Sequence, residues 1–370
     1  MTLIGSIAIG IFTLYACFML YFLSGLVRLR KTPNIKNLKK PIVSVVVAAR
    51  NEEENIRELL EDLNRQTYPQ AKLQIIIADD RSIDKTWSIV NDYINKYNNF
   101  IGVKISESSK TMTPKKNALT KAIEKSIGEI IVSTDADCRV PNTWVKSTVE
   151  TFDEETGIVI GYSKIDTASE RFFDHYQSID FLALMSANAG TLGWGNAWTG
   201  SGQNIAYRRL YFDKINGFNS VADKVSGDDF YLVQAISKIA KAKYNTNSKG
   251  FVKTKPSENF SKFISQRIRW ASNTKKLFNT NYLFLLFLFT NLLTNTILLL
   301  TLLLTTYWQF LSMLFGIKFL FDTVVLFYGS KLFKTEIRVN VFLLWFFLQP
   351  IYTPFIGILS MSGKVRWKTG

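Results

Sequence analysis

Long apolar runs stand at both ends of the chain, and a mixed polar sequence separates them. The first run extends from Leu3 to Val27, and the second covers most of residues 281–361. About 20 apolar residues in a helix cross the ~30 Å hydrocarbon core of a bilayer, so we expect one membrane helix before the mixed region and two to three after it. The pattern predicts three domains: an N-terminal anchor with a basic linker at 1–40, a globular domain at 41–275, and membrane or interfacial helices with a basic tail at 276–370.

The C-terminal apolar region contains two expected spanning helices, at about 282–304 and 307–329, and a third stretch at 339–361. Pro350 and Pro354 lie inside the third stretch, and proline can break a helix. We therefore favour a broken, re-entrant or interfacial hairpin that returns the C-terminus to the cytoplasm, with a plain crossing as the alternative. The positive-inside rule supports this choice, because basic residues flank the stretch on both sides. They are Lys331, Lys334 and Arg338 before it, and Lys364, Arg366 and Lys368 after it.

The formal net charge of +15 indicates anionic partners such as acidic lipid headgroups or phosphorylated substrates. Basic residues cluster after the N-terminal run, which predicts an uncleaved anchor and a globular domain in the cytoplasm, at a plasma membrane such as a bacterial inner membrane. No nucleic-acid-binding module is recognisable, so we expect no nucleic-acid partner, and the oligomeric state stays open. The cluster consists of Arg28, Arg30, Lys31, Lys36, Lys39 and Lys40.

Cysteine and histidine chemistry has little support in this chain. Cys17 lies in an apolar run and Cys138 in the globular region, and together they form neither a plausible disulfide nor a metal-binding spacing. His175 is the one histidine, which argues against histidine-based zinc sites and against a Ser-His-Asp triad. A catalytic base is therefore expected among the carboxylates.

Strand and helix patterns alternate in the globular region. Residues 42–48, 73–78 and 129–134 are short apolar runs rich in β-branched residues, which is typical of buried parallel strands. Residues 52–66 have apolar positions at helical spacing. The alternation predicts a doubly wound α/β domain, whose ligands bind at the carboxyl ends of the strands.

Acidic motifs follow the predicted strands. Asp79 and Asp80 come after the second strand, and Asp135 and Asp137 come after the third. Since the strand ends meet at one edge of the sheet, we expect these carboxylates to converge. Asp135 and Asp137 suit Mg²⁺ or Mn²⁺ carrying a diphosphate, although a lone Asp-x-Asp is more often a solvated turn.

The other acidic residues have two interpretations each. Asp79 and Asp80 can hold a nucleoside, or they can belong to the N-terminal cap of the helix expected from Ile83. Asp229 is the candidate general base for an acceptor hydroxyl, while the alternative is that Asp228 and Asp229 only favour the start of a helix.

Two segments near the end of the globular region combine polar and aromatic residues. The motif from Gln266 to Trp270 offers a guanidinium for a developing diphosphate and an indole that can stack on a sugar, and it also suits an interfacial anchor. The Gly- and Trp-rich segment 193–204 is typical of a flexible wall around a bulky ligand, with a plain surface loop as its default explanation.

These motifs, in this order, make the chain similar to the membrane-bound branch of the family 2 glycosyltransferases, which includes ceramide glucosyltransferases, hyaluronan synthases and cellulose synthases. The resemblance covers roughly residues 41–270. It implies a GT-A-type fold, a nucleotide-sugar donor that is most often UDP-linked, Mg²⁺ or Mn²⁺, and inversion at the anomeric carbon. The residues that it implies on the nucleotide side are Ala49, Asn51, Glu52, Asp79, Asp80, Lys115 and Asp135.

The resemblance also assigns the remaining roles. Asp137 holds the metal together with Asp135, and Asp229 is the catalytic base, with Asp228 as a residue that can share its role. Asp228 stands where the family often has Glu, and Arg81 stands where it has a small residue. The diphosphate and acceptor residues are Gln266, Arg269, Trp270, Trp198, Gly200 and Gly202.

We therefore expect a membrane enzyme that transfers a sugar from a nucleotide-sugar donor, a UDP-hexose, to a lipid or other membrane-associated acceptor at the cytoplasmic face. The alternative is a processive polysaccharide synthase, although three or four membrane segments provide little wall for a polymer channel. A non-catalytic membrane scaffold is a distant alternative, and the intact acidic set argues against it.

Overall fold

The computed structural model describes residues 3–31, 40–224, 226–273, 281–304 and 308–361. Several basic residues that entered the topology prediction lie outside these ranges: Lys36 and Lys39 in the linker, and Lys364, Arg366 and Lys368 in the tail.

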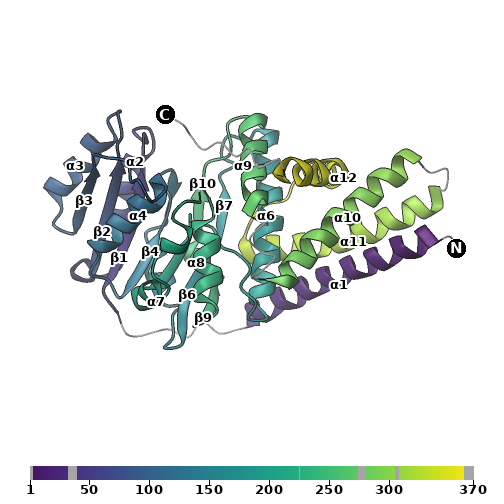
Figure 1. The fold of residues 1–370 in the computed structure, drawn as a ribbon, viewed down its shortest axis with the longest axis horizontal. Helices are drawn as coiled ribbons and strands as arrows, with labels where there is room; N and C mark the ends of the chain where they lie inside the picture. The colour runs from purple at the N-terminus through teal and green to yellow at the C-terminus, as the bar shows by residue number, and fades with distance from the viewer. Residues whose placement is uncertain (1–2, 32–39, 225, 274–280, 305–307, 362–370) are drawn as a thin grey trace. The chain divides into compact units, whose positions relative to one another are not determined.

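Packing divides the chain into two compact units, whose elements are labelled in Figure 1. The first unit comprises Met1–Leu29, Thr167–Trp194 and Pro256–Gly370, and the second comprises Arg30–Asp166 and Gly195–Lys255. The predicted domains are consecutive stretches of the chain, whereas each compact unit combines separate segments. The predicted boundaries at residues 40 and 275 therefore stay a prediction.

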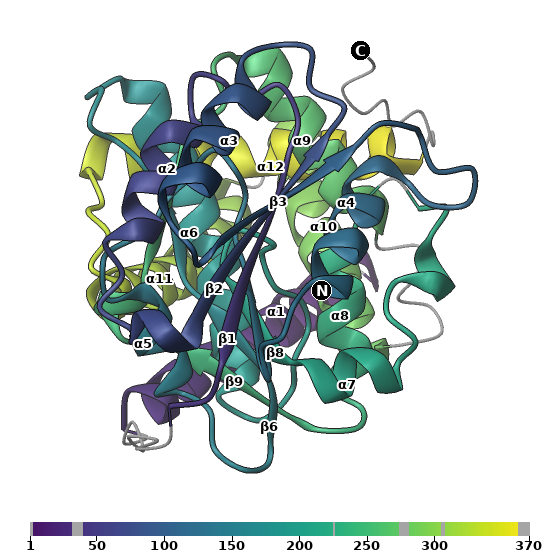
Figure 2. The same ribbon diagram turned by 90° about the vertical axis from the view of Figure 1, so that its left-hand side faces the viewer.

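A mixed sheet forms the centre of the second unit (Figure 2). The strands of this unit are β1 (Val43–Ala49), β2 (Leu73–Asp80), β3 (Phe100–Ile105), β4 (Ile130–Ser133), β5 (Cys138–Arg139), β6 (Thr156–Gly161), β7 (Ser163–Ile165), β8 (Ile205–Arg208), β9 (Lys241–Asn245) and β10 (Val252–Thr254). Within the described residues the main sheet has the order β3-β2-β1-β4-β8-β6-β9, and a small one has the order β5-β10-β7. Strands β3, β2, β1 and β4 are parallel, whereas β8 is antiparallel to both of its neighbours.

The parallel part of the sheet confirms the predicted doubly wound α/β core. Every residue of β2 is buried, as expected of a strand covered on both faces. Strand β1 has β2 on one side and β4 on the other, which makes it the switch point where open α/β sheets bind ligands. The helices of the second unit are α2 (Ile56–Asn64), α3 (Thr86–Lys96), α4 (Pro114–Glu124), α5 (Trp144–Val149), α7 (Arg209–Lys214) and α8 (Asp228–Ile236), with short 3₁₀ turns at Gln70–Lys72, Asn219–Val221 and Ser248–Gly250.

The first unit is helical throughout its described elements. Its helices are α1 (Leu3–Lys31), α6 (Phe172–Leu192), α9 (Phe260–Ser272), α10 (Tyr282–Leu304), α11 (Trp308–Phe333) and α12 (Val339–Met361). By length and composition, α1, α10, α11 and α12 are the helices among the described residues that could cross a membrane, in agreement with the predicted one N-terminal and two to three C-terminal helices. Helices α6 and α9, which the sequence pattern does not mark as membrane helices, pack against this group.

Glycine residues bring α1 and α6 into backbone contact. A Cβ atom at Gly25 of α1 would overlap the carbonyl oxygen of Gly190 in α6, and one at Gly193 would overlap the carbonyl oxygen of Gly25. A Cβ atom at Gly329 of α11 would overlap the side-chain hydroxyl of Ser186 in α6. Small residues allow helices to pack this closely, so these positions fix where α6 meets α1 and α11.

Helix α12 runs through both of its prolines, so the expected break at Pro350 and Pro354 is wrong. Proline removes a backbone donor, but helices of membrane proteins tolerate it where neighbouring helices and polar side chains support the backbone. Helix α12 has such support, because it packs against α6, α9 and α10. Thr353 also donates a 3.0 Å hydrogen bond to the Gln349 side chain, and this bond spans the helical turn that contains Pro350.

Candidate active site

The loops after β1 and β2 are joined by hydrogen bonds at the carboxyl edge of the sheet. The Asn51 backbone N–H donates to the Ser82 hydroxyl at 2.9 Å, and the Ile83 N–H donates to the Asn51 side chain at 3.0 Å. The Glu52 N–H donates to the Thr86 hydroxyl at 2.7 Å. Asn51 has φ 53°, a left-handed conformation that Asn tolerates better than most residues. The predicted nucleotide loop is therefore a fixed structure that begins where β1 ends.

The two aspartates after β2 have different environments. Asp79, in register with Ala49, is completely buried, and neither carboxylate oxygen has a hydrogen-bond partner in the described part of the chain. Burial raises the pKa of Asp79, and the nearby Ser82 opposes this effect only in part. Asp80 instead accepts two hydrogen bonds from Arg81, at 2.9 and 3.3 Å, and lies 3.5 Å from Arg50. Asp79 is thus the carboxylate left to receive a ligand donor.

Asp135 and Asp137 stand in the turn after β4. Burial raises the pKa of Asp137 to about 6, with further contributions from the negative charges of Asp135 and Glu52. A cation placed here would relieve the repulsion between these carboxylates. In the described residues no cluster of three potential ligands is preformed, so a bound metal ion would need donors from phosphate and water, as Mg²⁺ and Mn²⁺ commonly have. The two aspartates fit a metal held jointly by protein and diphosphate.

Lys115 connects the candidate metal motif with the candidate base. Its Nζ atom lies 2.7 Å from Asp135 and 3.7 Å from Asp228. Burial lowers the pKa of Lys115, but the charges of Asp135 and Asp228 outweigh this effect and raise it above its ordinary value. The sequence prediction put Lys115 on the nucleotide side, and the structure places its ammonium group among the carboxylates that would face the diphosphate.

Asp229 is oriented by backbone donors at the start of α8. The Gly202 N–H donates to one carboxylate oxygen at 3.0 Å, and the Phe230 N–H donates to the other at 2.7 Å. Burial raises the pKa of Asp229 to about 6; Asp228 adds to this increase, whereas Lys115 opposes it. A base whose pKa lies just below neutral pH is ionised in the cell and still accepts a proton readily.

The predicted Gly- and Trp-rich wall divides into residues with different positions. A Cβ atom at Gly202 would lie 3.5 Å from Lys115 and 3.9 Å from Asp229, so Gly202 borders the carboxylate cluster. One at Gly200 would meet Val233 of α8 at 3.0 Å. Trp198 is only 2% exposed, and its carbonyl oxygen accepts a hydrogen bond from Gln234. The Trp198 side chain is therefore buried, and its predicted role as an acceptor residue stays a prediction.

Gln266, Arg269 and Trp270 belong to α9 in the first unit, whereas the predicted aspartates belong to the second, and their diphosphate and acceptor roles stay a prediction. An interaction that sequence reasoning missed organises them: Arg267, only 5% exposed, forms a 2.7 Å ion pair with Asp180 of α6. Arg267 also donates to the Gln266 side chain at 2.8 Å and lies 4.3 Å from the centre of the Trp270 ring. The available signal was a lone acid, Asp180, between apolar residues, which commonly marks a buried ion pair.

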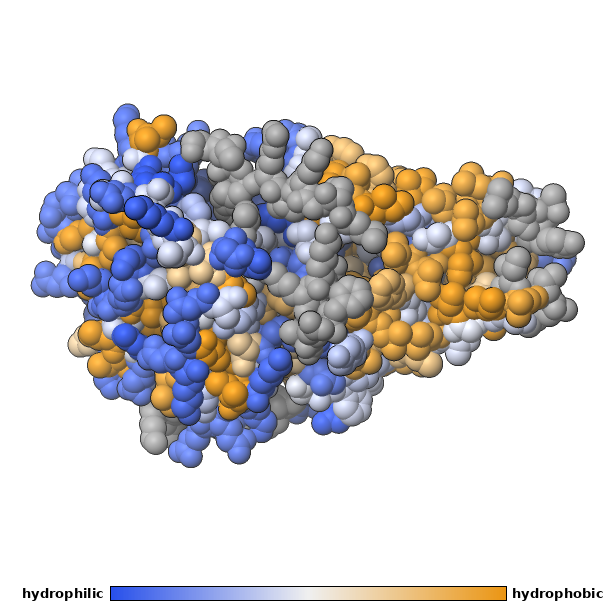
Figure 3. All heavy atoms as spheres, viewed as in Figure 1, coloured by the Kyte–Doolittle hydropathy of each residue, from blue (hydrophilic) through white to orange (hydrophobic). Residues whose placement is uncertain are grey.

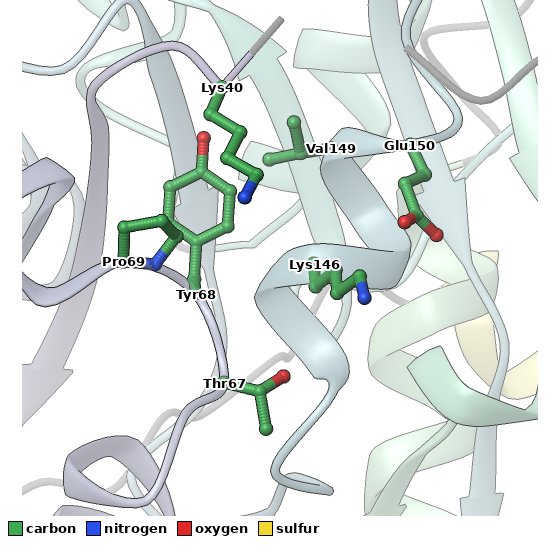
Figure 4. A pocket seen from close by; sticks show the side chains of 7 residues that line it. All are labelled: Lys40, Thr67, Tyr68, Pro69, Lys146, Val149 and Glu150. Carbon is green, nitrogen blue, oxygen red and sulfur yellow. The ribbon is translucent and has the colours of Figure 1, made fainter. Parts of the chain in front are cut away.

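A pocket of the second unit lies at the other edge of the sheet (Figure 4). Lys40 precedes β1 and Tyr68 precedes β2, so the pocket is at the amino ends of these strands. The Tyr68 hydroxyl donates to the Pro41 carbonyl at 2.6 Å, and burial raises the Tyr68 pKa to about 12. None of the predicted site residues lines this pocket, so it is separate from the carboxylate site.

The comparison with protein families agrees with this geometry. The model of the family described as Glycosyl transferase family 21 matches residues 7–370. The chain belongs to glycosyl transferase family 21. This result confirms the predicted resemblance to membrane-bound glycosyltransferases.

Curated relatives of the family 21 chain match part of its length. It is 32% identical over 206 residues to the probable glycosyltransferase YdaM of Bacillus subtilis (strain 168), which is 54% of this chain and 47% of that protein. It is 32% identical over 184 residues to the β-monoglucosyldiacylglycerol synthase of Nostoc sp. (strain PCC 7120), which is 48% of this chain and 38% of that protein. The chain thus spans less than half the length of these relatives.

A solved structure resembles the family 21 chain over nearly its full length. The mannosyltransferase PcManGT from Pyrobaculum calidifontis, in complex with GDP-Man and Mn²⁺, matches with a TM-score of 0.63 and 19% sequence identity. The match covers 98% of this chain and 100% of the other. At this level of identity the likeness shows a common fold.

Proposed function

We propose that this family 21 chain is an inverting glycosyltransferase that moves a sugar from a nucleotide-sugar donor, a UDP-hexose, to a lipid or other membrane-associated acceptor at the cytoplasmic face of the membrane. The observation that carries the proposal is the grouping of carboxylates at the carboxyl edge of the sheet, where Lys115 links Asp135 to Asp228. The relative named β-monoglucosyldiacylglycerol synthase supports a lipid acceptor.

Donor binding is assigned to the switch point of the sheet. Asp79 is buried without a hydrogen-bond partner among the described residues, so it can accept a hydrogen bond from an N–H or O–H group of the nucleoside. Leaving it unpaired costs free energy, and a ligand donor would recover that cost. The neighbouring Asn51 loop gives the nucleoside a rigid wall, because its backbone is tied to Ser82.

Asp135 and Asp137 are the residues that would hold a divalent metal ion on the donor diphosphate. Bound there, the ion would neutralise charge that develops on the diphosphate as the sugar leaves. The complex of PcManGT with GDP-Man and Mn²⁺ supports this use of a metal in the same fold. Lys115 adds a fixed positive charge beside Asp135.

Asp229 is the proposed general base of a single displacement. The acceptor hydroxyl oxygen forms a bond to the anomeric carbon, the bond from that carbon to the diphosphate breaks, and the hydroxyl proton passes to Asp229. The two backbone N–H groups at Gly202 and Phe230 hold the carboxylate in one orientation, which lowers the entropic cost of the step. Gln266, Arg269 and Trp270 stay proposed diphosphate and acceptor residues.

A donor screen with a native membrane lipid extract as acceptor tests the proposal. We expect one nucleotide sugar to give a lipid product whose mass has increased by one hexose, as measured by mass spectrometry. A ladder of polymer would favour a processive synthase, and no product with any donor would contradict the proposed function. Asp137→Ala should abolish Mn²⁺-dependent donor hydrolysis, whereas Asp92→Ala, at an exposed position of α3, should retain it.

A further inference from the structure

We propose that α12 does not cross the membrane but lies along one leaflet, with an apolar stripe on its surface in contact with phospholipid acyl chains. The stripe is defined as five residues that are exposed by 42–69%: Leu344, Phe347, Ile351, Phe355 and Ile358. Their spacing of three and four residues places them on a single face of the helix. This assignment concerns the membrane contact of the chain and does not depend on the proposed sugar transfer.

The direction of α12 within the first unit is the first support. In Figure 1, α1, α10 and α11 run lengthwise along the view. Figure 2 looks along that direction and shows α12 extended across the field. Where it meets α11, Phe342 and Phe346 both contact Phe319, with ring centres 5.7 and 5.2 Å apart. Further ring contacts join Phe315 and Phe327 of α11 to α12, and on α12 these contacts lie at residues 342–347, near its start.

The opposite face of α12 supports the same arrangement, because it contacts the charged Asp180 of α6 and the aromatic Phe263 of α9. The Trp345 ring N–H donates to Asp180 at 3.2 Å, and the Tyr352 ring stacks on Phe263 with centres 6.1 Å apart. Asp180 forms the buried ion pair with Arg267. Trp345 and Tyr352 are seven residues apart, which is about 10 Å along the helix axis. Both side chains contact the helices that hold the ion pair, so this length of α12 runs beside α6 and α9.

The ion pair also limits the depth of the middle of α12. Charged groups in the hydrocarbon centre are costly, and those found there commonly pair or reach toward the interface. Both ends of α6 lead to segments of the second unit. Helix α9 follows the second unit in the chain and leads to the start of α10, so both helices stay on one side of the membrane. A spanning α12 would carry one of its ends about 30 Å away from that side.

Large apolar side chains are also exposed on the neighbouring α10. Figure 3 shows hydrophobic residues over α12 and over the neighbouring α10. The chain on both sides of α12 is basic, with Arg338 before it and Lys364 and Arg366 after it. Cations at both ends and an apolar stripe between them fit a leaflet that contains acidic phospholipid. Arg338 is held beside Glu170, at the start of α6, by an ion pair.

Depth measurements with matched pairs of labels test the arrangement. In the full chain with Cys17→Ala and Cys138→Ala, single cysteines at Leu344 and Ile358 carry a fluorophore, and spin-labelled lipids in vesicles quench it. These positions are 14 residues apart, about 21 Å along a helix. We expect both labels at similar depth in one leaflet. The control pair, Leu286→Cys and Leu300→Cys on α10, has the same separation, and its depths should differ by most of that length.

Sidedness gives an independent test. A cysteine placed at Gly370 should react with a membrane-impermeant maleimide from the same side as Lys331→Cys at the end of α11, and from the opposite side to Trp308→Cys. Reaction from the Trp308 side, or a depth difference of about 20 Å between Leu344 and Ile358, would overturn the proposal. Stripe labels that lipid does not quench but that cross-link between copies would assign the stripe to a second copy of the chain, which also overturns it.

Discussion

The Nζ atom of Lys115 lies 2.7 Å from a carboxylate oxygen of Asp135. A cation of the chain itself is therefore in contact with the first aspartate of the candidate metal motif, and it also reaches Asp228, next to the candidate base. The charge of Lys115 acts both on the candidate metal motif and on the carboxylates beside the candidate base, because a positive charge favours the ionised form of each nearby carboxylate.

Replacing Lys115 should change the pH dependence of turnover. Lys115 lowers the pKa of Asp229, so Lys115→Met should raise that pKa above about 6 and move the acidic limb of the rate profile to higher pH. We expect kcat/KM to fall about tenfold at pH 6 and less at pH 8, since one pKa unit corresponds to a factor of ten. Lys121→Met, at an exposed position of the same helix, is the control. An unchanged limb would contradict this role of Lys115.

Removing the proposed base should abolish most turnover while donor binding persists. Asp229→Asn cannot take the acceptor proton, and we expect kcat to fall by about 10²- to 10⁴-fold. In the wild-type chain, the base must be ionised, so the rate should rise with pH through about 6 and then level off. Steady-state kinetics and calorimetric donor titration check both points. Near-normal turnover in Asp229→Asn, with Asp213→Asn as an exposed control, would refute the assignment.

Asp79→Asn should weaken nucleotide binding without lowering the stability of the ligand-free protein. The raised pKa of Asp79 means that the ionised carboxylate costs stability at neutral pH, so Asp79→Asn should leave the ligand-free protein equally stable or more stable. The same change should weaken nucleotide binding by about tenfold or more, because a hydrogen bond to a charged acceptor is lost. Thermal unfolding and nucleotide titration measure the two effects. Asp80→Asn, which breaks contacts to Arg81 and Arg50, should instead lower stability.

The buried pair of Asp180 and Arg267 should be important for the stability of the first unit. Asp180→Asn leaves a buried guanidinium without its counter-charge, and we expect a loss of about 3–5 kcal/mol in the free energy of unfolding. The control is Glu258→Gln, whose exposed pair with Lys262 should contribute less than about 1 kcal/mol. Denaturant titration in detergent compares the two. Equal effects would show that the buried pair contributes no more than a surface pair.

Two glycines of α1 offer a matched test of helix packing. A Cβ atom at Gly25 would overlap the backbone of Gly190, whereas one at Gly10 would meet no atom within 4 Å. Gly25→Ala should therefore lower the thermal midpoint by separating α1 from α6, at a cost of about 1–3 kcal/mol. Gly10→Ala should be neutral or stabilising by up to about 1 kcal/mol, because alanine favours helix. Similar midpoints for both variants would contradict the close approach.

Sequence reasoning found the parallel strands and the acidic motifs because each is a local pattern. A β-branched run followed at once by aspartate marks both a buried strand and its carboxyl end, as in β2 with Asp79. A proline is also a local signal, and it led to the wrong prediction of a break in α12. The helix continues because packing against α6, α9 and α10 outweighs the loss of the proline's backbone donor.

The sequence by itself determined the membrane helices, the α/β core and the set of carboxylates, because periodicity and strand ends depend on neighbouring residues. Only the tertiary structure decided which residues share a charge environment. Lys115 meets Asp135 and Asp228, and Arg267 meets a partner 87 positions away in the chain. It also decided that the Asp79 carboxylate has no hydrogen-bond partner among the described residues, while Asp80 is bound by Arg81 and Arg50. Such differences arise from burial and long-range contacts, which set the free energy of a charge and which no local pattern contains.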